Sequence, residues 1–329
     1  MDEIAACRRP RRAFTLIEML VVVVIIGILA GLVTAAAIAA RNRAKIAVIQ
    51  VEVSQLDMAI KEYKNKFGDY PPDFYGVHED YPPAIRDAAR TAVLRHLTKA
   101  FPRCTISGAD VDEKWDTLRT AVMSACGLSI DNLTPASAMV FWLGGLPASG
   151  AATKLVGFSA NPRNPFDTSA SRLPKLFEFE ETRIQGFDAS GACVAWPTFV
   201  ADGQKTPYVY FRARKTIGDR WEYGVVRGGT NFVPFDCDPT DNTNISRPYL
   251  ESVVGTGDPL QLAANSNTVR RWMNLETFQI ISPGLDDRFG CDHVSPFKFA
   301  PTGLGFCDEG NDFDNITNFS KGTLEDGME

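Results

Sequence analysis

Residues 14–40 read FTLIEMLVVVVIIGILAGLVTAAAIAA, and this apolar stretch decides how the chain is organised. From Met19 to Ala40 it contains no charged residue. A helix of that length extends about 33 Å at 1.5 Å per residue, and the hydrocarbon core of a bilayer is roughly 30 Å thick. The sequence therefore predicts a membrane-spanning helix at residues 19–40.

A basic segment precedes the apolar stretch, with arginines at Arg8, Arg9, Arg11 and Arg12. Basic residues next to a membrane segment are retained on the cytoplasmic side. We therefore expect a single-pass topology in which the N-terminus is cytoplasmic and the residues after Arg41 are exported.

One acidic residue, Glu18, lies at the start of the apolar stretch. A carboxylate at the centre of a membrane costs on the order of 2.5–3.5 kcal/mol, less near the interface, and such acids usually have a partner. In one interpretation Glu18 is simply solvated at the membrane surface. In the other, cleavage between Ala13 and Phe14 creates an α-amino group that Glu18 pairs with, in its own chain or in a neighbouring one.

These residues resemble the N-terminal signal of type IV pilins and type II secretion pseudopilins, in which a short basic leader and a small residue precede FTLIE and an apolar helix. Here Arg11-Arg12-Ala13 precede Phe14-Thr15-Leu16-Ile17-Glu18. The resemblance implies that residues 1–13 are a leader which a prepilin peptidase removes after Ala13. It also implies that Phe14 is N-methylated and that Glu18 guides assembly.

The same resemblance implies the partners and the location of the protein. The partners are prepilin peptidase, other pilin or pseudopilin subunits and an inner-membrane assembly platform. The subunit resides in the bacterial inner membrane with its head in the periplasm, and in a filament after assembly. Two positions depart from the usual pattern, because Ala13 replaces a glycine and Ala35 stands where a helix-kinking proline is common.

The helix is predicted to continue beyond the membrane, over residues 14–67. Apolar residues recur at alternating intervals of three and four and so form one narrow stripe on a helix. We expect the stripe to pack on the protein's own head, the alternative being a coiled-coil seam. Gly68 and the prolines at 71–72 end the helix near residue 67. The stripe consists of Ile46, Ile49, Val53, Leu56, Ile60, Tyr63 and Phe67.

Residues 68–329 are predicted to form an extracytoplasmic, pseudopilin-like globular head of α+β class. Helical periodicity at 83–101, 110–126 and 135–143 indicates a helical insertion. Segments rich in aromatic and β-branched residues at 207–213, 221–226 and 277–282 indicate strands. We expect these strands to form an antiparallel sheet packed across the helix stripe.

The chain has seven cysteines, and loss of the leader would remove Cys7 and leave an even number. An even number in an exported head suits disulfides, although the sequence does not determine their pairing. The pairs closest in sequence, Cys291 with Cys307 and Cys104 with Cys126, are the first candidates. Buried free thiols are the alternative.

The C-terminal region is rich in carboxylates, the hard oxygen donors that calcium prefers. It resembles the end of the major pseudopilin of type II secretion systems, where a strand, a G-x-D turn and a D-x-D stretch enclose calcium. Here Gly284-Leu285-Asp286 and Asp312-Phe313-Asp314 match these parts. The resemblance implies Asp286, Asp312 and Asp314 as calcium ligands, with the Pro283 carbonyl as a weaker candidate. A long insertion separates the two halves, and a bridge between Cys291 and Cys307 would restrain it.

The composition and the absence of common motifs argue against several other functions. The net charge of -6 argues against binding along a phosphate backbone, so nucleic acid is not an expected partner. HExxH, GxxxxGK[ST], GxSxG and paired CxxC motifs do not occur, and His96 is predicted on a helix surface. We therefore expect a structural filament subunit and not an enzyme. The alternative function is a signal-anchored extracytoplasmic enzyme or binding protein. A competing interpretation of the N-terminal segment is an ordinary secretory signal cleaved at the small residues Ala35-Ala36-Ala37.

Overall fold

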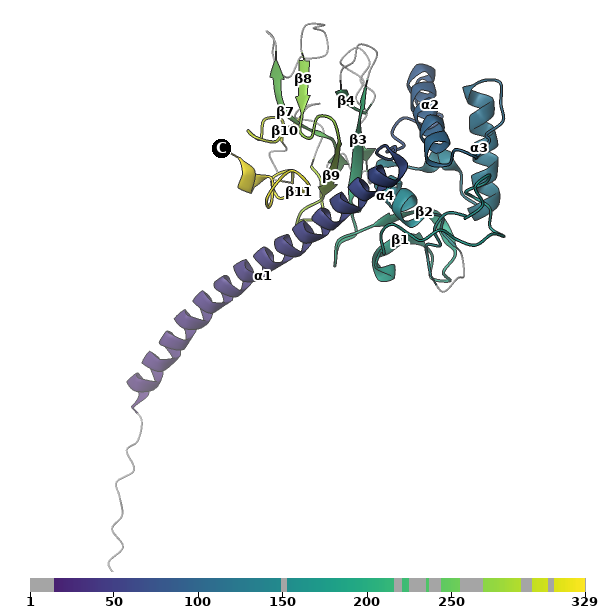
Figure 1. Ribbon diagram of the computed structural model, residues 1–329. Helices are drawn as coiled ribbons and strands as arrows, with labels where there is room; N and C mark the ends of the chain where they lie inside the picture. The colour runs from purple at the N-terminus through teal and green to yellow at the C-terminus, as the bar shows by residue number, and fades with distance from the viewer. Residues whose placement is uncertain are drawn as a thin grey trace, which may run out of the picture. The chain divides into compact units, whose positions relative to one another are not determined.

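The structure is a computed structural model that describes residues 15–148, 153–215, 221–224, 235–236, 244–254, 269–290, 298–306 and 311–328. The chain divides into two compact units, residues 1–45 and 46–329. The division falls inside the longest helix, α1 (Leu16–Phe67), which is labelled in Figure 1.

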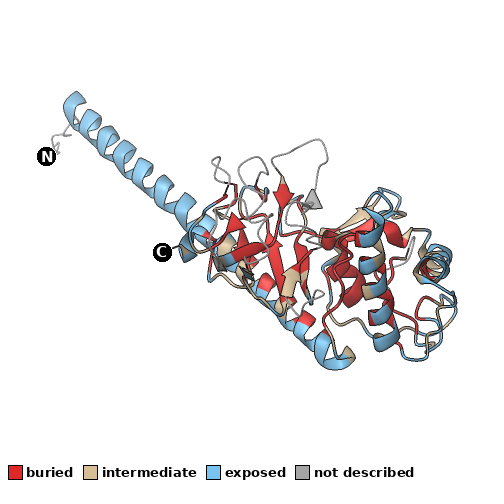
Figure 2. Ribbon diagram, turned by 90° about the horizontal axis from the view of Figure 1, so that it is seen from above, coloured by how far each residue is buried: buried red, intermediate tan, exposed pale blue. Residues whose placement is uncertain are grey.

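The first unit consists, from residue 16 on, of the N-terminal part of α1. Its large apolar side chains are exposed, from Leu16 through Ile38, as Figure 2 shows by colour. Within the described part of the chain, α1 is the one helix long and apolar enough to cross a membrane, judged by length and composition. The predicted spanning segment, residues 19–40, lies inside this helix.

In the second unit the remainder of α1 packs on the head through the predicted stripe. Ile46 and Phe67 at the ends of the stripe are partly buried, and the residues between them are buried in the main core. Glu52 next to the stripe accepts hydrogen bonds from Arg183 Nη2 and the Tyr208 hydroxyl, both at 2.5 Å. The packing interpretation is therefore confirmed. The buried members are Ile49, Val53, Leu56, Ile60 and Tyr63.

The predicted helices of the insertion are present with nearly the expected bounds. They are α2 (Pro83–Ala100), α3 (Val111–Cys126) and α4 (Pro135–Gly144). Proline at the first position starts α2 and α4, while Asp110 caps α3 by accepting a hydrogen bond from the Glu113 N–H at 2.9 Å. Every residue of α4 is buried, so this helix forms the centre of the main core.

A buried carboxylate, Asp131, joins the two outer helices of the insertion. It lies in the short helix η1 (Ile130–Asn132). It accepts hydrogen bonds from Trp115 Nε1 at 2.6 Å, Arg119 Nε at 2.5 Å and Arg90 Nη2 at 3.2 Å. Because Arg90 belongs to α2 and the other two donors to α3, one acid ties both helices to the chain that enters α4.

The principal sheet has four strands in the order β11-β9-β3-β4, all antiparallel. Its centre is formed by β3 (Val209–Lys215) and β9 (Phe278–Ser282), and all five residues of β9 are buried. The edges are β4 (Trp221–Tyr223) and β11 (Ile316–Thr317). The three predicted strands are thus neighbours in one antiparallel sheet, which confirms the α+β class.

Three smaller sheets complete the described head. In the three-stranded sheet, β7 pairs antiparallel with β8 and parallel with β10. The other two sheets are the pairs β1-β2 and β5-β6. The bounds are β1 (Ile184–Phe187), β2 (Cys193–Phe199), β5 (Phe235–Asp236), β6 (Ile245–Ser246), β7 (Tyr249–Val254), β8 (Val269–Trp272) and β10 (Lys298–Phe299), with short helices η2 (Glu181–Arg183) and η4 (Glu325–Gly327).

Candidate functional site

The first turn of α1 is closed by a capping box between Thr15 and Glu18. The Thr15 N–H and hydroxyl both donate to Oε2 of Glu18, at 2.9 and 2.8 Å, and the Glu18 N–H donates to the Thr15 hydroxyl at 3.3 Å. These bonds satisfy backbone groups that the start of a helix leaves without intrahelical partners. The T-x-x-E spacing that predicts such a box is present at residues 15–18, although the prediction for Glu18 took no account of Thr15.

The cap changes the interpretation of Glu18 as an isolated acid. Its carboxylate has hydrogen-bond donors within its own chain, which lowers the cost of placing it at a membrane boundary. Both bonds involve the same oxygen, Oε2. The processing residues Ala13 and Phe14 lie outside the described residues.

A second candidate site is the turn after β9, where Asp286 and Asp314 come together. Oδ2 of Asp314 accepts hydrogen bonds from the Leu285 N–H at 2.6 Å and the Asp286 N–H at 3.0 Å. Gly284 lies against the same carboxylate, because a Cβ built there would be 2.4 Å from Asp314 Oδ1. With φ at 70°, this position also favours glycine by its backbone conformation. The turn thus holds two acids beside one glycine.

The electrostatics of this turn favour a cation. Desolvation, followed by the charge of Asp314, raises the pKa of Asp286 to about 6, and burial raises the pKa of Asp314. Oδ1 of Asp314 and Oε1 of Gln204 are buried acceptors with no hydrogen-bond donor among the described residues. The amide nitrogen of Gln204 donates to the Gly284 carbonyl. Acceptor oxygens without donors, together with raised acid pKa values, fit a hard cation such as calcium.

Asp312 does not join the other two acids. Its carboxylate receives the Lys298 ammonium and the Tyr249 hydroxyl, the latter at 3.2 Å. The Pro283 carbonyl accepts the Arg288 N–H at 3.2 Å. Consistent with this, the described ranges contain no group of three or more His, Cys, Asp or Glu side chains arranged for a metal. Of the three predicted ligands, the structure therefore brings together Asp286 and Asp314, with Gln204 as a neighbour that was not predicted.

The predicted bridge between Cys104 and Cys126 is wrong, because both are free thiols. Burial raises the pKa of each, and the Cys126 thiol donates to the Val122 carbonyl at 3.3 Å within α3. The cysteine that Cys126 influences is Cys193, whose pKa rises to about 11 through desolvation and then through Cys126. Closeness in sequence thus gave the wrong neighbour. Cys291 and Cys307 lie outside the described residues.

His96 is buried, contrary to the prediction of a helix-surface position. It is 3% exposed, and its Nε2 shares a hydrogen bond with the Tyr63 hydroxyl at 2.8 Å. Its ring stacks on Tyr63 and meets Trp142 edge-on. Desolvation, with Arg212 as the next cause, lowers the pKa of His96 to about 3. This residue is therefore a neutral component of the core that holds α1.

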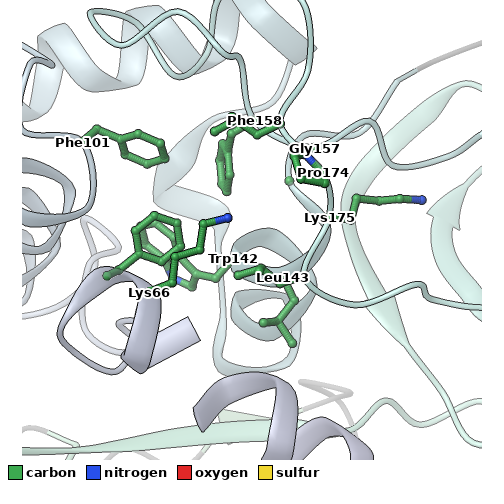
Figure 3. A pocket seen from close by; sticks show the side chains of 12 residues that line it. Lys66, Phe101, Trp142, Leu143, Gly157, Phe158, Pro174 and Lys175 are labelled. Carbon is green, nitrogen blue, oxygen red and sulfur yellow. The ribbon is translucent and has the colours of Figure 1, made fainter. Parts of the chain in front are cut away.

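A small apolar cavity lies between the end of α1 and α4, lined by aromatic rings and the stem of Lys66 (Figure 3). Its volume is about 20 Å³, enough for roughly one water molecule. Pockets that bind organic ligands are typically several hundred Å³ in volume. This cavity is therefore a packing defect and not a substrate site.

Comparison with known proteins assigns the N-terminal site to a class. The family model described as "Prokaryotic N-terminal methylation motif" matches residues 8–34. No curated protein and no solved structure matches the chain. The motif and the long apolar helix that contains most of it fit a type IV pilin-like or pseudopilin-like precursor. The motif implies processing by a prepilin peptidase and assembly with other pilin-like subunits in general.

Proposed function

We propose that the protein is a structural subunit of a type II secretion pseudopilus or a type IV pilus-like filament, without enzymatic activity. The observation that carries the proposal is the match of residues 8–34 to the methylation motif. In this proposal the peptidase cuts after Ala13 and methylates Phe14. An inner-membrane platform then draws α1 of each subunit from the membrane into the filament, and the head remains periplasmic.

The capping box gives Glu18 a defined state before assembly. In the membrane, Thr15 supplies its hydrogen bonds. In a filament, the amine of a neighbouring Phe14 would approach the same carboxylate in surroundings that exclude water, where opposite charges attract strongly. The cap therefore stabilises the Glu18 carboxylate at the helix start before assembly, and the ion pair with the neighbouring subunit forms afterwards.

The capping role and the charge role can be separated by two variants. Glu18→Gln keeps an acceptor for the Thr15 donors but removes the charge, whereas Thr15→Val keeps the charge and loses the hydroxyl bonds of the cap. We expect Glu18→Gln to insert into the membrane normally and to reduce the subunit in sheared filaments by about tenfold, equivalent to about 1.4 kcal/mol. Thr15→Val should assemble nearly normally, because a lost cap costs only about 1 kcal/mol of helix stability.

For each variant, immunoblots of the membrane fraction measure insertion, and immunoblots of the sheared-filament fraction measure incorporation. Normal incorporation of Glu18→Gln would remove the assembly role of the charge. Mass spectrometry of the native N-terminus decides between the proposal and a signal-anchored protein. Methylated Phe14 supports the filament subunit, while an intact leader or a start at Ile38 supports the alternative.

We also propose that the turn formed by Asp286 and Asp314 binds calcium in the mature head. The raised pKa values of both acids and the buried acceptor oxygens support this. A bound cation would oppose the repulsion between the carboxylates and join the turn after β9 to the segment that enters β11. Its role in this proposal is structural.

A further inference from the structure

The C-terminal ends of α1 and α2 together present a basic surface. Its exposed side chains, which we call the basic patch, are Lys64 and Lys66 on α1 and Arg95 and Lys99 on α2. The two helix ends lie side by side, because the Lys99 ammonium donates to the Gly68 carbonyl just after α1, at 2.8 Å. Residues 31 or more positions apart in the sequence thus contribute to one surface.

Aromatic packing holds the two helix ends against each other. The rings of Phe67 and Phe101, which end α1 and follow α2, have centroids 6.0 Å apart. Lys66 and Phe101 line the same small cavity (Figure 3). The Lys64 ammonium lies 4.3 Å from the centroid of the Tyr70 ring. The basic patch is therefore carried by two helices that are packed on each other and not by a loop.

The basic patch keeps its positive charge. Within the ranges that the structure describes, none of its side chains forms an ion pair, whereas the neighbouring Lys61 is paired with Asp57 at 2.5 Å. Asp69, which follows α1, is paired with Arg212 at 2.8 Å. Glu62 is the one exposed acid on residues 60–67. The patch is therefore positive overall and accessible to another molecule.

The beginning of α3 carries the opposite charge. Residues 110–116 contain four exposed acids, which we call the acidic patch: Asp110, Asp112, Glu113 and Asp116. Lys114 is the one basic residue in this stretch, and it is only partly exposed. The side chains of Asp112 and Asp116 each contact an arginine of their own chain and still remain 60% and 64% exposed. A second molecule can therefore reach these carboxylates.

Helix dipoles explain only part of this charge distribution. Basic residues in the last turn of a helix and acids in the first turn interact favourably with the dipole, and the effect is confined to those turns. Lys99 and the acids Asp112 and Glu113 lie in such positions. Arg95 and Asp116 lie outside them, so the two patches extend beyond what helix stability requires.

We propose that the basic patch of one copy of this protein binds the acidic patch of a second copy. The chain has a net charge of -6, so copies repel one another except where a positive surface meets a negative one. The patches are two different surfaces, so the contact is heterologous and can repeat from copy to copy, as a filament requires. The inference rests on the proposed filament function and names the surfaces through which neighbouring heads meet.

The chemistry of the contact determines what it contributes. Complementary charges fix the orientation and the choice of partner more than they add affinity. Exposed charges are also screened by salt, with a Debye length of about 3 Å at 1 M ionic strength. We therefore expect the contact to orient neighbouring heads and to weaken strongly in 1 M salt, while the apolar helix α1 is unaffected by it.

Carbodiimide cross-linking of the full-length protein, in native membranes and in sheared filaments, tests the proposal. The reagent joins a lysine amine to a carboxylate only where the two are in contact. The wild type should give a cross-linked dimer in which mass spectrometry finds lysines of the basic patch joined to acids of the acidic patch. Exposure to 1 M salt before the reagent should remove most of these links.

Two complementary variants distinguish links between copies from links within one copy. The basic-patch variant combines Lys64→Gln, Lys66→Gln and Lys99→Gln. The acidic-patch variant combines Asp110→Asn, Asp112→Asn and Glu113→Gln, and asparagine at 110 can still cap α3. Each variant alone should lose about tenfold in dimer, since little attraction remains. Co-expression should restore part of the dimer, because the lysines of one variant still meet the acids of the other.

Lys321→Gln is the matched control, because this exposed lysine lies outside the patch and its loss should leave the dimer unchanged. Wild-type filaments without links between the two patches would overturn the proposal. Patch lysines joined to a different protein, or no recovery on co-expression, would do the same. Patch-to-patch dimers in membranes that never yield filaments would support the contact and remove the filament function, so the two failures are distinguishable. The wild-type map decides the question even if a variant fails to fold.

Discussion

Glu18 accepts two hydrogen bonds from Thr15, so in the isolated chain its carboxylate stabilises the first turn of α1. This contact between neighbouring residues is one that a sequence motif can predict. T-x-x-E predicts a capping box from local geometry alone. The partner of the charge in an assembled filament depends on a second molecule, which no local pattern contains.

Other contacts could not be predicted from local sequence patterns, because their partners lie far away in the sequence. His96 lies on a helix with mixed polar and apolar residues, and only the packing of Tyr63 and Trp142 from other helices shows that its face is buried. Asp312 lies in an acid-rich segment that suggests a metal ligand, but it faces Lys298. By contrast, the proximity of Asp286 and Asp314 was predicted, because the resemblance supplied the long-range pairing.

His96 should make the stability of the head depend on pH. Its pKa is about 3 when folded and about 6.5 when unfolded, so the unfolded chain binds the proton more readily between these values. Stability should therefore fall as the pH decreases from about 6.5 towards 3, by up to about 1.4 kcal/mol per pH unit. Urea unfolding of a 46–329 fragment between pH 7 and 4 measures this dependence.

The matched variant is His96→Gln, which offers the Tyr63 hydroxyl a polar partner but does not titrate. Its stability should vary less with pH than that of the wild type. The two proteins would then differ in how much unfolding free energy they lose between pH 7 and pH 4. If both lose the same amount, His96 is protonated in the folded state at pH 4 and does not cause the dependence.

Calcium should stabilise the head through the acids of the turn after β9. With a pKa near 6, Asp286 is mostly ionised at pH 7.5 and faces Asp314. Calcium should raise the Tm at this pH and EGTA should lower it. The calcium effect should weaken below pH 6, because protonation of Asp286 removes a ligand charge. Differential scanning fluorimetry measures both effects.

Asp314→Asn should abolish the calcium response, because it halves the charge of the pair. Asp80→Asn is the control, since the Asp80 side chain is 90% exposed and pairs with His78. A calcium response of equal size in Asp314→Asn and in the wild type would exclude this turn as the site.

At the scale of elements, the helices were predictable, whereas only three of the eleven described strands, β3, β4 and β9, were. Periodicity, prolines at the first position and Gly68 determine α1 to α4 locally. The strand β2 was missed because Pro197 interrupts its pattern, and proline within a run argues against a strand. The parallel pairing of β10 with β7 joins segments far apart in sequence and has no local signature.

The helical insertion should depend on Asp131, because this acid joins α2 and α3. Asp131→Ala removes the acceptor of Trp115 and Arg119 and leaves the buried Arg90 without one of its carboxylates. Breaking a buried charge network typically costs about 3–5 kcal/mol. Asp116→Ala is the matched control, since it removes another partner of Arg119 whose side chain is 64% exposed. Exposed pairs contribute at most about 1 kcal/mol.

Chemical unfolding of the 46–329 fragment and of both variants gives the two free-energy differences. We predict that Asp131→Ala loses much more unfolding free energy than Asp116→Ala. Equal losses would mean that Asp131 contributes no more than a surface acid.

For the whole molecule, the division between the compact units lies at residue 45, inside α1, whereas the sequence suggested a boundary after Phe67. The difference has a physical cause. The stripe residues of α1 face the same core as Trp142, Tyr208 and Phe278, so this part of the helix belongs to the head by packing. The helix α1 ends at residue 67, but the compact unit that contains the head begins at residue 46.

Truncation tests this conclusion. A fragment beginning at residue 46 keeps the stripe and should unfold cooperatively. A fragment beginning at residue 68 loses five buried side chains, each stabilising by about 1.5–3 kcal/mol, and also the acceptor that Glu52 provides for Arg183. That loss is on the order of 10 kcal/mol, comparable with the whole stability of a typical domain. The shorter fragment should therefore be unfolded or aggregated by circular dichroism and size-exclusion chromatography. Recovery of a folded 68–329 fragment would show that the head forms without α1 and that the stripe is only docked upon it.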